Sequence, residues 1–194
     1  MQEFIHNKVK VIEELFTEFN QIQRLYAEKS YEFESRFTDF LNKLSDYFNN
    51  RGDQAKESEV LRVTNMLQTV KRGFNTTKME KVNTGRRELL WGFAYNGIEN
   101  IDSLLQEIHL KETSKLEEGD EIISGLILNL IQQGFLTDQK LQELNSYTEI
   151  EAYWNFLLTQ NGSISVINKK LRMKLIPEDI YLLVEKVISR ITTQ

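Results

Sequence analysis

The first fifty residues carry a regular apolar pattern and contain neither glycine nor proline. Apolar side chains recur at every seventh position, forming a seam that consists of Ile5, Ile12, Phe19, Tyr26, Phe33, Phe40 and Tyr47. Further apolar residues lie four positions after members of the seam, namely Val9, Phe16, Phe37 and Leu44. A period near 3.5 residues with such neighbours predicts one amphipathic helix. A helix of about 48 residues would be roughly 70 Å long, so we expect the rest of the chain to lie along it.

Aromatic side chains occupy much of this seam, which bears on how the helix packs. Two-stranded coiled coils prefer Ile, Val and Leu, whose side chains fit the small holes between two helices. Bulky rings suit the wider centre of a three- or four-helix bundle. We therefore expect this helix to pack against other helices of the same chain. Phe19 and Phe33 should be buried in the middle of the seam, whereas Phe48 lies off it and should contribute much less to stability.

A second helix is predicted to follow after a short turn. The first helix should end at residues 49–52, Asn-Asn-Arg-Gly, because Asn and Gly tolerate the left-handed conformation of a helix C-cap. Asp53 is a suitable N-cap for the next helix. Its apolar residues then step by three and four positions and comprise Val60, Val63, Leu67, Val70 and Phe74. Two long apolar stripes joined by a short turn predict an antiparallel helical hairpin.

The helical spacing of apolar residues is lost over residues 73–85 and returns from Arg86 to Ile108. Within the interruption, Thr77 to Glu80 could form a capping box. Gly92 and Gly97 fall inside this stretch and would each cost a helix about 1 kcal/mol relative to Ala. The close approach of another helix would explain them.

Residues 111–121 are polar and charged, which predicts a boundary there. Beyond it we expect helices near 120–133, 137–145, 148–160, 163–175 and 177–191. The predicted fold is all-α, with a long antiparallel helical hairpin or bundle over residues 1–112 and a compact bundle of short helices over residues 113–194. Few segments resemble strands.

The composition limits the compartment in which the protein is expected and the kinds of site it can form. The chain has no cysteine, which excludes disulfides and thiolate zinc sites. The opening MQEFIHNKVK lacks the apolar core of a signal peptide, and the longest apolar run, residues 122–131, is too short to span a membrane. We therefore expect a cytoplasmic protein that does not insert into membranes.

No catalytic, cofactor or metal site is predicted. Glu3 and His6 have the Glu-x-x-His spacing of helical di-iron sites, but such sites need a second pair. His109 does not supply one, because Gln106 occupies the corresponding position. Both histidines are therefore interpreted as surface residues. The sequence also lacks a Gly-x-Ser-x-Gly elbow and a glycine-rich phosphate loop, so we predict that the protein is not an enzyme.

The chain is acidic, with a net charge of -5, but many of its basic residues are concentrated in one stretch. Residues 71–87, the basic segment, hold one acidic and six basic residues, and the basic ones are Lys71, Arg72, Lys78, Lys81, Arg86 and Arg87. One interpretation is intramolecular pairing with the acidic first helix. The other is a docking surface for an acidic protein or a nucleic-acid backbone. Within the second we favour a protein, because no aromatic residue lies between residues 75 and 90 to stack on bases.

These patterns predict a non-enzymatic interaction, scaffolding or adaptor protein that acts within a multi-protein assembly through helical surfaces or self-association. One alternative is a nucleic-acid-associated accessory protein that uses the basic segment. Another is an acidic inhibitor or immunity-type protein that blocks a basic partner through residues 99–121, the acidic segment.

Overall fold

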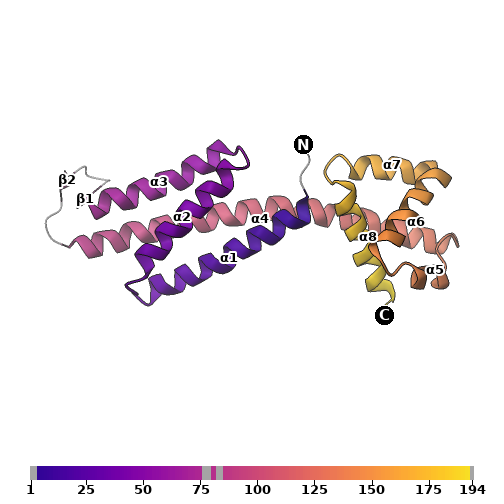
Figure 1. Cartoon of the computed structure of the whole chain (residues 1–194), viewed down its shortest axis with the longest axis horizontal. Helices are drawn as coiled ribbons and strands as arrows, with labels where there is room; N and C mark the ends of the chain where they lie inside the picture. Colours follow the sequence, from indigo (N-terminus) through magenta and orange to yellow (C-terminus); the bar gives the residue numbers. More distant parts are fainter. Residues whose placement is uncertain (1–3, 76–79, 82–84, 193–194) are drawn as a thin grey trace. The chain divides into compact units, whose positions relative to one another are not determined.

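The computed structural model describes residues 4–75, 80–81 and 85–192. This part of the chain is all-α, with eight helices and one short antiparallel hairpin (Figure 1). The helices are α1 (Ile5–Ala27), α2 (Phe33–Asn49), α3 (Gln54–Lys71), α4 (Arg86–Gln132), α5 (Asp138–Glu143), α6 (Tyr147–Gln160), α7 (Gly162–Leu171) and α8 (Pro177–Thr192). The strands are β1 (Phe74–Asn75) and β2 (Glu80–Lys81).

The chain forms two compact units. One consists of residues 12–108, and the other combines residues 1–11 with residues 109–194. Helices α1 and α4 therefore contribute residues to both units. The division at residue 112 stays a prediction.

The prediction of one unbroken first helix is wrong, because α1 ends at Ala27 and α2 begins at Phe33. Lys29 adopts a left-handed conformation, with φ of 52°. The N–H of Ser30 donates to the carbonyl of Leu25, and that of Lys29 donates to the carbonyl of Tyr26. These two bonds form a Schellman C-cap, a motif that usually has glycine where this chain has lysine. The absence of glycine therefore concealed the break.

From Ile12 onward the seam continues across the turn, because both helices bury it against one core. Phe19 of α1 stacks on Phe40 of α2, with ring centroids 5.5 Å apart. Phe19 and Phe33 are buried as predicted. Phe48 is buried too, so the reason for expecting it to contribute little to stability no longer holds. A straight helix repeats every 3.6 residues and drifts from a strict seven-residue spacing. The buried stripe of α2 has consequently moved from Tyr47 to Phe48 near its end.

The turn between α2 and α3 follows the prediction. Gly52 is left-handed with φ of 69°, and the side chain of Asp53 accepts a hydrogen bond from the N–H of Lys56. Phe74, however, lies on β1 and not on α3, and it is 42% exposed. The capping box predicted at residues 77–80 lies mostly outside the described residues.

Helix packing explains one of the two glycines in the first part of α4. A Cβ on Gly97 would lie 3.0 Å from the Val63 side chain of α3, so the expected close approach is confirmed there. Nothing lies within 4 Å of a Cβ on Gly92, so the same explanation is wrong for that residue.

The predicted boundary at residues 111–121 does not end a helix, because α4 continues through it. Two of its acidic side chains pair with basic residues later in the chain: Glu118 pairs with Lys174, and Asp120 with Arg190 at 2.6 Å. A Cβ on Gly119 would lie 2.7 Å and 2.9 Å from methyl carbons of Leu175 and Leu183. Polar composition here therefore reflects a continuous helix with several paired charges and not an interruption of the helix.

The remaining elements, α5 to α8, lie near the predicted positions and share a core with the end of α4. Trp154 of α6 is 2% exposed, and its indole N–H donates to the Asn168 side chain of α7 at 3.1 Å. None of the described helices combines the length and apolar character that crossing a bilayer requires.

Candidate functional site

The structure separates the six basic residues that the sequence singled out. Lys71 ends α3 and Arg87 is the second residue of α4, and both line one pocket. Arg72 and Lys81 are exposed but do not line it. Two of the six cannot be placed: Lys78 lies outside the described residues, as does the side chain of Arg86, whose backbone begins α4.

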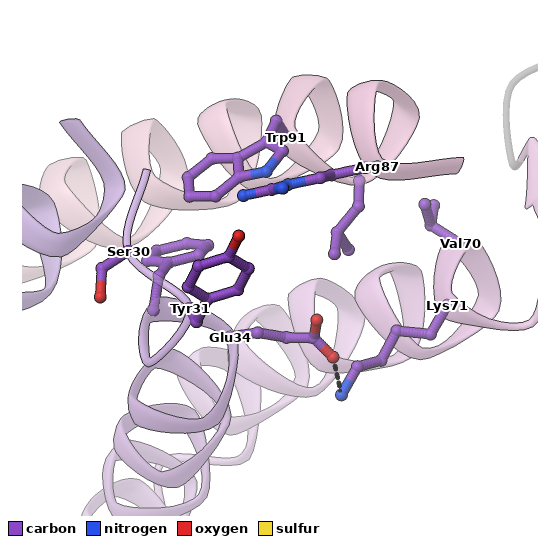
Figure 2. Close-up of a pocket in the computed structure, with 9 residues that line it drawn as sticks. Ser30, Tyr31, Glu34, Val70, Lys71, Arg87 and Trp91 are labelled. Atoms are coloured by element: carbon purple, nitrogen blue, oxygen red, sulfur yellow. Dashed lines mark ion pairs between the residues drawn. The ribbon is translucent and has the colours of Figure 1, made fainter. Parts of the chain in front are cut away.

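This pocket, called the aromatic pocket below, belongs to the unit of residues 12–108 and has a volume of about 330 Å³ (Figure 2). Three elements build it: the turn from α1 into α2, the end of α3 and the first turns of α4. Its lining residues are Ser30, Tyr31, Phe33, Glu34, Val70, Lys71, Arg87, Leu90 and Trp91. Residues far apart in the sequence thus form one concave surface.

Stacked rings fix the aromatic side of the pocket. The Trp91 ring lies 5.0 Å from that of Phe33, with 25° between their planes, and 4.9 Å from that of Tyr26. The Tyr26 hydroxyl donates to the carbonyl oxygen of Trp91 at 3.1 Å. Burial, and then the neighbouring Tyr95, raise the pKa of Tyr26 above its ordinary value, so this donor keeps its proton at neutral pH. The indole is therefore held in place before any ligand arrives.

Tyr31 differs from these rings because it is 88% exposed. In the view of Figure 2, the guanidinium of Arg87 lies between the Tyr31 ring and the indole of Trp91. The centre of the guanidinium lies 5.1 Å from the Tyr31 ring centroid, within the range of a cation–π interaction.

The two cations of the pocket differ in their charge balance. Lys71 Nζ lies 2.5 Å from a carboxylate oxygen of Glu34, so its charge is compensated (Figure 2). In the part of the chain that the structure describes, no carboxylate forms an ion pair with Arg87. Within this described part, the charge of Lys71 is compensated and that of Arg87 is not.

Sequence reasoning missed the aromatic partners of the basic segment. The segment itself holds no aromatic residue after Phe74, but the fold brings Tyr31 and Trp91 to Arg87. One local signal was available, because Arg87, Trp91 and Tyr95 are spaced by four and share one helical face. Tyr31 gave no such signal, since its position depends on the turn at Lys29.

His6 is partly exposed, but it also makes a contact with a buried group that the interpretation as a surface residue did not include. In the unit that contains residues 1–11 and 109–194, its Nδ1 lies 2.7 Å from an oxygen of the buried Asp179. The backbone N–H groups of Ile5 and His6 donate to the same carboxylate, each at 3.0 Å. Burial alone would raise the pKa of Asp179, but these hydrogen bonds outweigh it and lower the pKa. The carboxylate thus caps the first turn of α1 from a distant helix.

Within the described ranges, no three side chains of metal-ligating type gather at one point. Comparisons with known proteins gave no match to a family model, a curated protein or a solved structure.

Proposed function

We propose that this chain is a non-enzymatic cytoplasmic interaction protein that binds a protein partner at the aromatic pocket. The observation that carries the proposal is the meeting of Tyr31, Arg87 and Trp91 around one opening. Residues that dominate binding energy at protein interfaces are enriched in Trp, Tyr and Arg, and they cluster in pockets. An adaptor or scaffolding role within an assembly would follow from such a site.

The exposure of Tyr31 supports this assignment. Its ring is 88% exposed, although burying an aromatic side chain is favourable. It lines the same pocket as Trp91, whose orientation is fixed by Phe33 and Tyr26. The fixed ring of Trp91 and the exposed ring of Tyr31 together offer apolar area to a partner. Because Trp91 is already held in place, binding to it costs little conformational entropy.

Nucleic acid is the less favoured partner. Aromatic rings beside a cation could stack a base, which removes part of the sequence argument against this class. The charge of Lys71 is compensated by Glu34, however, and a phosphate backbone requires several free cations for affinity. The inhibitor alternative is also less favoured, because Glu107, Glu118 and Asp120 of the acidic segment already pair with basic residues of this chain.

The test is capture of partners from the native host with the wild-type chain and with Tyr31→Ala. Because Tyr31 is exposed, its truncation should leave the helical circular dichroism and the thermal midpoint almost unchanged. Loss of a specific captured protein, at unchanged stability, is the expected result.

Leu61→Ala provides a matched control. Leu61 is an exposed apolar residue of α3 in the same unit, and it does not line the aromatic pocket. Its substitution should leave the captured set intact. An identical partner set for wild type and Tyr31→Ala would refute the proposed role of this pocket.

A further inference from the structure

The shape of the aromatic pocket restricts what can occupy it. Its volume of about 330 Å³ lies at the lower end of the range for ligand sites. Phe33 and Val70 are buried beneath it, and Leu90 and Trp91 are partly buried at its side. These residues form an apolar surface large enough for one or two side chains. A bulky apolar side chain of a partner would therefore fit the pocket.

The charges around the opening further restrict which group of a partner can bind there. Glu34 is engaged by Lys71, so this pair contributes little net charge. Among the described residues, the guanidinium of Arg87 contacts the Tyr31 ring and forms no ion pair with a carboxylate. A guanidinium binds carboxylates with two parallel hydrogen bonds, and an adjacent aromatic face keeps it extended. The complementary group is therefore an Asp or Glu side chain close to the apolar one.

We propose that the aromatic pocket receives an acidic peptide segment of the partner, with a bulky apolar side chain on its apolar lining beside Tyr31 and a neighbouring carboxylate on Arg87. This inference rests on the proposed function and specifies the chemistry of the partner.

The experiment selects peptides from a random-peptide display library on the immobilised full-length chain, with an unrelated helical protein as the background. Enriched peptides should combine Asp or Glu with Phe, Trp, Leu or Ile. Synthetic copies of the enriched peptides are then titrated against variants, with Trp91 fluorescence as a local readout.

Two variants change the charge of the pocket in opposite directions. Arg87→Gln removes the carboxylate partner and should weaken binding roughly tenfold or more. Glu34→Gln releases Lys71 from its ion pair and should strengthen binding of the same peptides. Lys81→Gln is the matched control, because Lys81 belongs to the basic segment but does not line the pocket. Its binding curve should coincide with that of wild type.

The outcomes separate this inference from the proposed function. Peptides that lose affinity in Tyr31→Ala but not in Arg87→Gln would overturn the acidic specificity and leave the pocket as a binding site. Enriched peptides without acidic residues would do the same. Peptides indifferent to Tyr31→Ala would count against the proposed function itself. No enrichment above background, or binding of an oligothymidylate that depends on Arg87, would overturn the inference.

Discussion

Replacing Asp179 tests the most demanding contact in the structure. Its carboxylate is buried and accepts from the backbone N–H groups of Ile5 and His6 and from the His6 side chain. The first N–H groups of a helix have no partner within the helix, so this side chain supplies what a local N-cap would provide. In Asp179→Ala all three donors lose their acceptor. Since leaving a buried donor without its partner costs about 1–3 kcal/mol, we expect a loss of at least that size in the free energy of unfolding.

The two tryptophans make this measurement specific. Trp154 lies in the same unit as Asp179, whereas Trp91 lies in the other. In a Trp91→Phe background, urea denaturation followed by fluorescence therefore reports on the unit that holds Asp179. Glu178→Ala is the matched control: Glu178 also belongs to the first turn of α8, but it is exposed. It should cost less than about 1 kcal/mol. Equal losses for the two variants would refute the capping role of Asp179.

The pH dependence of the stabilisation by Asp179 follows from the direction in which its pKa is shifted. The pKa of Asp179 is lowered in the folded chain, so its carboxylate stabilises the fold fully above its ordinary pKa, about 3.9. That contribution is lost as the pH falls from there through the lowered pKa. The stability gap between wild type and Asp179→Ala should therefore narrow below about pH 4. A gap that stays constant down to pH 2 would show that the lost stability comes from packing and not from the carboxylate.

Further substitutions test the packing of the two cores and the helix cap at Lys29. Phe48→Ala should cost about 3–5 kcal/mol in the urea denaturation of the unit of residues 12–108, similar to Phe33→Ala, because both rings are buried. Gly119→Ala should lower stability by about 1–3 kcal/mol, since its Cβ would meet leucine methyl groups at 2.7 Å and 2.9 Å, while Gly125→Ala, with open space, should not. Lys29→Gly should raise the thermal midpoint slightly, by up to about 1 kcal/mol in stability, because φ is 52° there; a lower midpoint would contradict the cap assignment.

The sequence was sufficient for the fold class and for most helix ends that use common cap residues. Gly52 and Asp53 both act at the predicted turn, since their conformational and hydrogen-bonding preferences are local. The long-range contacts had no local signal. Asp179 caps a helix that begins 174 residues away, so nothing near His6 announced its partner. The exposure of Tyr31 and the burial of Phe48 likewise depend on which helices happen to lie alongside.

The break at Lys29 shows why the candidate site was beyond sequence reasoning. Ser30, Tyr31, Phe33 and Glu34 of the aromatic pocket come from the turn or from the start of α2. On one continuous helix these residues would be spread around the helix axis, because successive positions differ by about 100°. The turn instead brings them against Trp91, so the pocket exists only because the helix ends. The stability of that left-handed cap and the geometry of the aromatic pocket are therefore coupled in this fold.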